Sequence, residues 1–587
     1  MPGMAEMQPI PPPEQLPAPV KMAGIGNSHI AIKASPEAQA WFDQGLSLLH
    51  DFWDYESAKA FEQAIRVDPN CAMCWWGLSK AIAMREDAMS VYGKKALARA
   101  VELKGHASGA EKMYIDAAAA EAAAKDNDRT SEIAILRTLV KKNPKDLEAR
   151  IFLAGAVGNG FDDKGEPKPG QKERIAILES VMLDAPNDSA ANHYWIHAME
   201  PGNHPEAALK SAALLASLAP NSGHMVHMPG HIFYRVGNYA EAEHWFAASM
   251  EADERYMREQ HVSLDDDWNY VHNMMYAIAN LMEQGKLSEA DRLSDHLSAA
   301  RGKLSATLYI WSARDQLARI GQRLPVALRV GDWDAVLTML SQASLDRNGV
   351  GEGEKTVNLR FLAAELIDYA RGMKALEGQD AAAVDLDAAQ AASARMDAGL
   401  WRAQHDQAAK DAAKDKKDDV KNDDAKLHEP KKDQPPMAVI MPDANAEPLM
   451  KCLSIASLEL RAGVLVAQGK LDEAKKLYAT ALVEEKKAGY HEPPFYIRPV
   501  GENEAAALLR AKDYAGAKAA YEAALAERPN SGFGVYGLAR VKELEGDAAG
   551  AREGYAAFLK VWATADATLP EMEQARSMVA GEAQGTR

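Results

Sequence analysis

Small and aromatic apolar residues recur along this chain at a fixed spacing. Ala517 and Tyr521 return as Ala551 and Tyr555, which is a period of 34 residues. Residues four positions apart share one face of a helix, and a 34-residue period is typical of a helix–turn–helix unit of the tetratricopeptide (TPR) type. Such a unit cannot bury its apolar face alone, so the pattern predicts units stacked one on the next.

Further copies of this pattern extend over most of the chain. One copy occupies residues 41–69, and another occupies residues 226–250, where Gly230, Gly237, Ala242 and Phe246 hold the pattern positions. Weaker copies begin near Trp75, Tyr114, Arg150, His193, Trp268, Leu359 and Leu458. Alanine runs, such as residues 116–124, also favour helix over strand. The sequence therefore predicts an all-α fold, a TPR-type α-solenoid of about ten to twelve helix pairs.

Composition divides the chain into five predicted segments. Residues 1–34 are rich in proline and are expected to form a flexible leader. Residues 35–400 are expected to form the main solenoid, with a histidine-rich groove at residues 190–280. Residues 401–445 are charged and almost free of large apolar residues, so we expect a disordered linker or insertion there. Residues 446–565 carry the C-terminal repeats, and residues 566–587 form a tail.

The bulk composition argues against several classes of partner. A net charge of −18 argues against nucleic acid, which requires clustered Lys and Arg, and against an anionic membrane surface. No stretch approaches 18 continuous apolar residues, so no membrane-spanning segment is expected. If Met1 is the native start, the expected compartment is the cytoplasm, whereas a removed signal peptide would place the protein in the periplasm or outside the cell.

Common catalytic motifs do not occur in the sequence. It contains no HExxH, GxSxG or EF-hand loop. Residues 349–356 resemble a phosphate-binding loop, but Glu354 stands where the second glycine is required. Its carboxylate would face the phosphate oxygens, and we therefore expect no nucleotide.

Cys71 and Cys74 form a CxxC pair at the entry to a predicted helix. A helix N-terminus can lower a thiol pKa, which would suit redox or metal chemistry. However, the sequence lacks a second CxxC and a thioredoxin-like βαβ pattern. We predict that both cysteines are small buried packing residues, and the sequence leaves their redox activity open.

Histidine is concentrated in one part of the chain. Of the 16 histidines, nine fall between residues 193 and 272. His224, His227 and His231 occupy positions 2, 5 and 9 of a predicted first helix and so lie within an arc of about 60°. In a TPR unit these positions line the concave surface, and the register places His272 at position 2 of the next unit. His193 and His197 belong to the preceding unit and are expected to flank the groove.

These histidines suggest two kinds of function. Imidazole with carboxylate suits Zn, Cu, Fe or Ni, and the candidate metal ligands are His193, His197, His224, His227, His231 and His272. Glu200 and Asp253 are the candidate acid or base groups of a metal-dependent enzyme. Alternatively, the groove holds a peptide or a partner protein, because a single histidine is more often a hydrogen-bonding residue than a ligand. The sequence does not decide between a binding protein, a metal carrier and an enzyme.

Several segments resemble those of a group of bacterial TPR proteins. The segments are CAMCWWG, which begins at Cys71, GHMVHMPGHI, which begins at Gly223, and WNYVHNMMYAIA, which begins at Trp268. The resemblance covers most of residues 25–300 and implies a TPR fold. It selects His197, His224, His227, His231 and His272 as signature residues and supplies no reaction. Many members look exported, which weighs against a cytoplasmic location.

Overall fold

Helices account for the regular structure of the described residues. The computed structural model describes residues 18–83, 90–125, 128–162, 164–262, 264, 267–300, 317–318, 320–343, 359–377, 384–423, 446–494 and 496–581. Within these ranges there is no strand, only an isolated bridge between Phe161 and Pro167. None of the described helices is both long and apolar enough to cross a membrane. The all-α prediction is confirmed.

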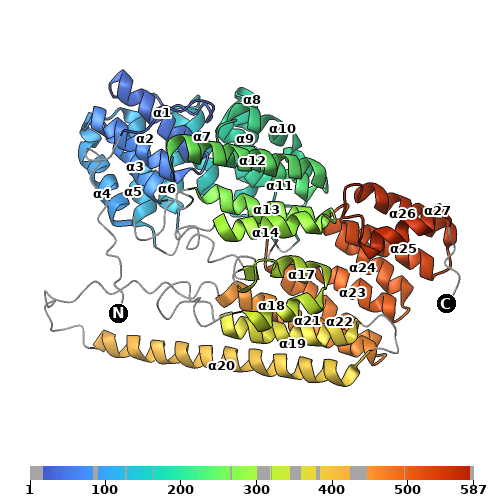
Figure 1. Cartoon of the computed structure of the whole chain (residues 1–587). Helices are drawn as coiled ribbons and strands as arrows, with labels where there is room; N and C mark the ends of the chain where they lie inside the picture. Colours follow the sequence, from blue (N-terminus) through green and yellow to red (C-terminus); the bar gives the residue numbers. More distant parts are fainter. Residues whose placement is uncertain are drawn as a thin grey trace. The chain divides into compact units, whose positions relative to one another are not determined.

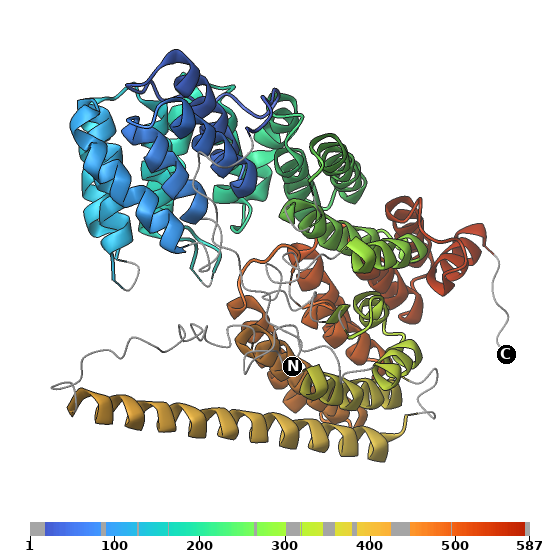
Figure 2. The same cartoon turned by 60° about the vertical axis from the view of Figure 1, so that its left-hand side comes forward.

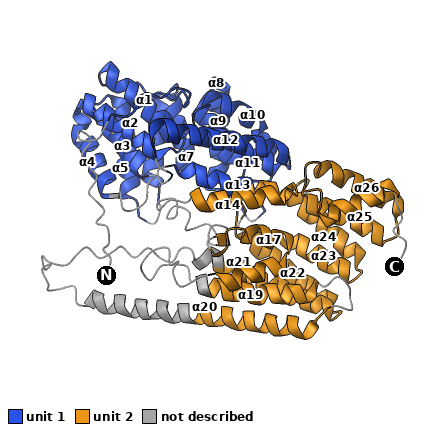
Figure 3. Cartoon of the chain, viewed as in Figure 1, with its two compact units in different colours: residues 1–277 blue, residues 278–587 orange. Residues whose placement is uncertain are grey.

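The chain divides into two compact units, residues 1–277 (unit 1) and residues 278–587 (unit 2), coloured separately in Figure 3. Unit 1 contains α1 (Pro36–His50), α2 (Asp54–Val67), α3 (Ala72–Ala83), α4 (Ser90–Leu103), α5 (Gly109–Ala123), α6 (Thr130–Lys142), α7 (Leu147–Val157), α8 (Pro169–Asp184), α9 (Ser189–Met199), α10 (Leu209–Leu218), α11 (Gly223–Arg235) and α12 (Tyr239–Gln260). The short 3-10 helices η3 (Lys104–His106) and η4 (Pro205–Ala208) also belong to it. The division falls within α13 (Trp268–Glu283).

Unit 2 is also built of helices in its described residues (Figure 1). It contains α14 (Leu287–Ala300), α17 (Leu324–Val330), α18 (Trp333–Gln342), α19 (Leu359–Leu376), α20 (Leu386–Asp423), α21 (Ala446–Ala467), α22 (Leu471–Lys487), α23 (Val500–Arg510), α24 (Tyr514–Glu527), α25 (Gly532–Leu544), α26 (Ala548–Val561) and α27 (Pro570–Ala580). In the described chain α1–α14 make seven consecutive pairs, and α17–α26 make five more. These twelve pairs match the predicted ten to twelve of a TPR-type solenoid.

The spacing of small and aromatic residues reflects close packing of paired helices. Gly45 of α1 lies against the ring of Phe61 of α2, so that an added Cβ would stand 2.9 Å from the ring. Gly230 of α11 has the same relation to Phe246 of α12, at 2.4 Å. Both rings are fully buried. Glycine is required at these positions because the ring of the second helix occupies the space of a side chain.

Residues 18–34, part of the predicted flexible leader, lie against unit 1 at α7, at the start of α9 and at the turn before α11. Gly24 accepts a hydrogen bond from the backbone N–H of Asn221 at 2.8 Å. The amide oxygen of Asn27 accepts from the backbone N–H of Ser189 at 2.9 Å, and Asn27 in turn donates from its own backbone to Ser189 Oγ. His29 donates from its backbone to Glu148. These hydrogen bonds give backbone groups of residues 18–34 partners in unit 1. The composition of the segment does not reveal these partners. Residues 1–17 lie outside the described residues.

Residues 401–423, the first part of the predicted disordered linker, continue α20 (Figure 2). The segment is rich in Ala, Lys, Gln and Asp and lacks proline before Pro430. Ala, Lys and Gln have high intrinsic helix propensity, and a helix needs no apolar face to form from such residues. Low apolar content therefore did not distinguish a polar helix from a disordered segment. The remaining residues of the predicted linker, 424–445, lie outside the described residues.

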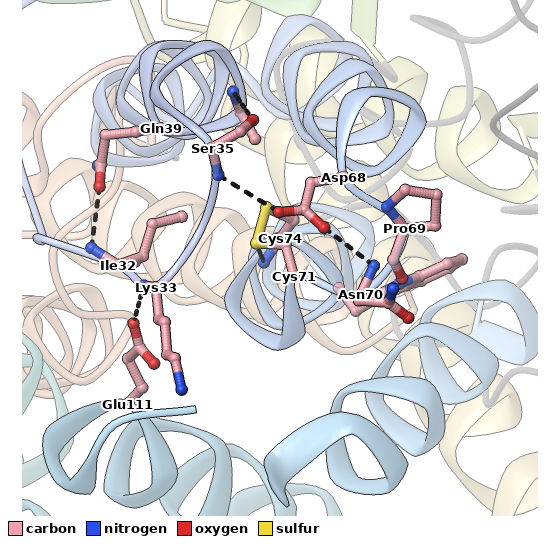
Figure 4. The surroundings of a disulfide bond; sticks show 12 residues. Ile32, Lys33, Ser35, Gln39, Asp68, Pro69, Asn70, Cys71, Cys74 and Glu111 are labelled. Carbon is pink, nitrogen blue, oxygen red and sulfur yellow. Dashed lines mark hydrogen bonds between the residues drawn. A yellow bond between two sulfur atoms is a disulfide. The ribbon is translucent and has the colours of Figure 1, made fainter. Parts of the chain in front are cut away.

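Cys71 and Cys74 are joined by a disulfide at the start of α3 (Figure 4). Both are buried, as predicted from sequence, with exposed fractions of 1% and 0%. The disulfide itself was not expected. Around it, the backbone N–H of Ser35 donates to Asp68, and the same carboxylate accepts from the backbone of Asn70. Burial separates the disulfide from solvent thiols, which sets it apart from an exposed redox pair.

Candidate metal centre

Three helices of unit 1, each the first of its helix pair, carry the six candidate histidines. His193 and His197 lie on α9, His224, His227 and His231 lie on α11, and His272 lies on α13. The N-terminus of α9 is fixed by Asp188, whose side chain accepts from the backbone N–H of Ala191 at 2.7 Å. α11 contains an internal Pro229, between the last two of its histidines. Pro229 has no N–H and so removes one intrahelical hydrogen bond in that turn.

The histidines form two groups of three. In the first triad, which is His193, His197 and His224, one ligand atom of each ring lies within 4.8 Å of the other two. In the second triad, which is His227, His231 and His272, the same limit holds. The two triads adjoin, because the rings of His224 and His227 are stacked with their centroids 5.9 Å apart. All six predicted ligands are thus brought together, including His193 and His197, which were expected only to flank the groove.

Oxygen acceptors fix the tautomer of three imidazoles. His193 Nδ1 lies 2.7 Å from the backbone oxygen of His50. His197 Nδ1 and His231 Nδ1 lie 2.6 Å and 2.8 Å from the two carboxylate oxygens of Glu200. These oxygens can only accept, so each neutral ring carries its proton on Nδ1 and its lone pair on Nε2.

Two asparagines of α13 act in the same way on the other two histidines of α11. His224 Nδ1 lies 3.1 Å from Asn269 Oδ1, and His227 Nδ1 lies 2.6 Å from Asn273 Oδ1. The amide groups are oriented by their own donors. Asn269 donates to Asp253 at 2.8 Å, and Asn273 donates to the backbone oxygen of Phe246 at 2.7 Å. Each asparagine therefore presents its oxygen to an imidazole, which places the lone pair of that ring on Nε2.

The arrangement brings two lone pairs face to face. His227 Nε2 lies 2.5 Å from His231 Nε2, and both rings are fully buried. Since each ring donates its only proton from Nδ1, this contact is repulsive unless a cation or an extra proton lies between the nitrogens. In the first triad, His193 Nε2 and His224 Nε2 have no hydrogen-bond partner within the described residues.

Burial keeps the cluster in its neutral form. The exposed fraction is 0% for His193, 5% for His224 and 8% for His272. Burial, and then the neighbouring imidazoles, lower the pKa values of His193, His224, His227 and His231 well below the usual range. The same two causes lower the pKa of His272 to about 4. The repeat register predicted that these rings line an open groove. Instead, neighbouring helices and loops cover them.

The two predicted acid or base groups occupy supporting positions. Glu200, the C-cap residue of α9, is 1% exposed and accepts from one histidine of each triad. Asp253 is also 1% exposed and is linked to the cluster through Asn269. Burial and the neighbouring Asp267 raise the pKa of Asp253 well above its usual range. Glu200 orients two histidines directly, and Asp253 orients His224 through Asn269.

Sequence reasoning missed Asn269, Asn273 and Phe52. The two asparagines are spaced i, i+4 on α13, like His227 and His231 on α11, and this parallel spacing was the available signal. Phe52 gave none. It has a positive φ of 58° in the turn after α1, and its ring stacks on His197 with a centroid separation of 5.3 Å. Its ring centroid also lies 4.8 Å from that of His193, so Phe52 packs against two rings of the first triad.

Comparisons with known proteins give low similarity. No family model matches the chain, and no curated protein matches it. Solved structures that align over most of its length include the yeast Tom70, at 13% identity over 93% of this chain and 95% of that chain, with a TM-score of 0.27. They also include the APC/C hetero-tetramer Cut9–Hcn1, at 13% identity over 92% of this chain and 96% of that chain, with a TM-score of 0.24. The TPR domain of P58(IPK) aligns at 12% identity over 75% of this chain and all of that chain, with a TM-score of 0.19. The 34-residue period and the helix pairs themselves support a TPR-type α-solenoid fold.

Proposed function

We propose that this protein binds a transition-metal ion through the buried histidine cluster. The observation that supports the proposal most directly is the contact between His227 Nε2 and His231 Nε2, at 2.5 Å. Two neutral imidazoles with their protons on Nδ1 repel at this distance, and a metal ion would turn both lone pairs into ligands.

The hydrogen bonds around the histidines resemble those that orient metal-binding histidines in other proteins. A ligating histidine usually donates its other ring N–H to a carboxylate, a backbone carbonyl or a similar acceptor, which fixes its orientation. His193, His224 and His231 each have such an acceptor, namely the His50 carbonyl, Asn269 and Glu200. In a tetrahedral zinc site with Zn–N distances of about 2.0–2.1 Å, two nitrogens stand about 3.3 Å apart. The close pair would thus need to separate by about 1 Å.

The burial of the histidines favours metal over peptide as their ligand. A peptide requires exposed side chains along a groove, whereas five of the six histidines are at most 8% exposed. Three imidazoles with nitrogen ligand atoms suit Zn, Cu, Fe or Ni. The ligand set does not choose among these metals, and carriage, storage and catalysis all begin from the same binding step.

The test is metal analysis of full-length protein without an affinity tag. We expect Zn, Cu, Fe or Ni to copurify, or Zn²⁺ to be taken up after treatment with a chelator. Zn²⁺ at 100 times its Kd would stabilise the folded protein by about 2.7 kcal/mol, which a thermal midpoint detects. The variant H227Q/H231Q should take up less metal than the native protein, because it lacks both nitrogens of the close pair.

The matched control is H244Q, because His244 is an exposed residue of α12 outside the cluster. It should bind metal like the native protein. Circular dichroism must show both variants folded. If folded native protein neither retains metal nor takes up any of the four ions at micromolar concentration, the proposal is wrong.

A further inference from the structure

The carboxylate of Glu200 connects the two triads. Its Oε1 accepts from His197 of the first triad, and its Oε2 accepts from His231 of the second. Glu200 is the residue that caps α9, so its backbone is held by the helix that carries His193 and His197. One buried carboxylate thus sets the tautomer of one ligand in each group.

Six imidazoles exceed what one ion needs. Zinc sites typically hold three or four protein ligands, and imidazole-rich sites with three histidines leave a position for water or substrate. The ligand atoms form two separate groups within the 4.8 Å limit, and among the described residues they do not form one group of six. Each group alone supplies three nitrogens.

We propose that the cluster holds two metal ions, one in each triad, and that Glu200 couples them as a shared positioning residue. This proposal rests on the metal-binding function proposed above. Each ion takes Nε2 atoms as ligands, from His193, His197 and His224 in the first triad. In the second triad, His227 and His231 contribute Nε2, and His272 contributes one ring nitrogen. The negative charge of Glu200, hydrogen-bonded to a ligand of each ion, also reduces the repulsion between two cations.

The chemistry of Glu200 predicts a specific effect of its amide analogue. Glutamine has one accepting oxygen and one donating NH₂ group, where glutamate has two accepting oxygens. In E200Q, the imidazole that faces the NH₂ must accept at Nδ1, so its proton moves to Nε2. That ring then has no lone pair for metal, and one of the two triads keeps only two ligands.

Metal stoichiometry in full-length protein tests both parts of the proposal. Chelator-treated protein would be titrated with Zn²⁺, and bound metal would be measured by elemental analysis after desalting. We expect two Zn²⁺ per native chain. H193Q/H224Q in the first triad, and separately H227Q/H272Q in the second, should each leave one. E200Q should leave one tight site and weaken the other by about 10–100-fold, as loss of an outer hydrogen bond does in other metal proteins.

E206Q is the matched control for E200Q. Glu206 accepts from His204 at 3.0 Å in an exposed pair of the same repeat, so it tests the same chemistry away from the cluster. It should bind two Zn²⁺ with native affinity. Circular dichroism and thermal unfolding without metal must show the variants folded, and His→Asn substitutions replace any that are not.

The outcomes separate this inference from the proposed function. No bound metal in the native protein overturns both. One Zn²⁺ per native chain, lost in both double variants, overturns the two-ion site and leaves the proposed function standing. Two Zn²⁺ with native affinity in E200Q overturn the coupling role of Glu200.

Discussion

The Cα of Gly223 lies directly against the carboxylate of Asp253. A Cβ added at Gly223 would stand 1.5 Å from Asp253 Oδ1, so no side chain fits there. Asp253 accepts from Asn269, which holds Nδ1 of His224. A single glycine at the start of α11 therefore determines how closely a buried carboxylate approaches the histidine cluster.

We predict that G223A disturbs the first triad through this chain of contacts. The methyl group would displace Asp253, release the amide of Asn269 and leave His224 without a fixed orientation. The thermal midpoint should fall, with a cost of about 1–3 kcal/mol for the buried groups that lose partners. G155A is the control, because Gly155 is an exposed residue of α7 with open space around its Cα. G155A should raise the free energy of unfolding by up to about 1 kcal/mol. Equal midpoints for G223A and native protein would contradict the prediction.

The lowered pKa of His272 predicts a specific pH dependence. Its pKa is about 4 in the folded protein, against about 6.5 when unfolded. Between these values the unfolded state binds more protons, so stability from this group is lost as pH falls below about 6.5, at up to about 1.4 kcal/mol per pH unit. Buried carboxyl groups act in the opposite direction, among them Asp267, whose pKa burial raises to about 7.

Comparison of metal-free H272Q with native protein isolates the histidine. We expect the variant to gain stability relative to native protein between pH 6.5 and pH 5. Urea unfolding at each pH would measure this difference. A constant difference across that range would show that His272 does not titrate as its burial requires.

A buried ion-pair network in unit 2 should respond strongly to loss of one carboxylate. Arg329 lies 3.0 Å from Glu283 and 2.6 Å from Glu502, and Arg528 also contacts Glu283 at 3.0 Å. Burial alone would raise the pKa of Glu283, but the charges of the two arginines lower it to about 2. E283Q leaves buried positive charge uncompensated and should cost about 3–5 kcal/mol.

The double variant E283Q/R329M tests the origin of that cost. It removes both charges, so it should be more stable than the sum of the single effects by at least about 1 kcal/mol. Chemical unfolding of the four proteins gives this coupling. Additive effects would mean that the network contributes through packing alone.

Burial of the Cys71–Cys74 disulfide predicts slow reduction of the native protein. In native buffer without reductant, a thiol reagent should detect one cysteine at most, Cys452, which is half-buried. After unfolding with reductant it should detect three. The double variant C71A/C74A lacks the disulfide and should lose at most about 2 kcal/mol of unfolding free energy. The loss is small because the native disulfide closes a loop of only four residues. Rapid labelling of three thiols in folded protein would contradict the assigned disulfide.

The sequence was sufficient where the arrangement of the histidines depends on one helix. His224, His227 and His231 share a face because helical geometry places them there, and the repeat period sets His272 on the next first helix. It was insufficient for His193 and His197, since the face that α9 presents depends on how it packs against α11 and on the ring of Phe52. Tertiary packing also turned the predicted open groove into a buried cluster.

The outer contacts were harder to predict than the ligands. Glu200 was identified as a polar neighbour, but its double acceptance follows from the angle between α9 and α11. The i, i+4 spacing of Asn269 and Asn273 is the one signal that the sequence offers for them. Their role comes from amide groups held by Asp253 and the Phe246 carbonyl, and no local pattern encodes these partners.

The hydrogen bonds of residues 18–34 have a practical consequence for recombinant expression. A gene truncated at Pro36, the start of the first helix, would discard Asn27, whose amide and backbone both bind Ser189 at the N-terminus of α9. It would also remove the carbonyl that accepts from Asn221, two residues before α11. A cleavable tag should therefore be joined ahead of Ala18, so that the fusion boundary leaves α9 and α11 with these contacts near their N-termini.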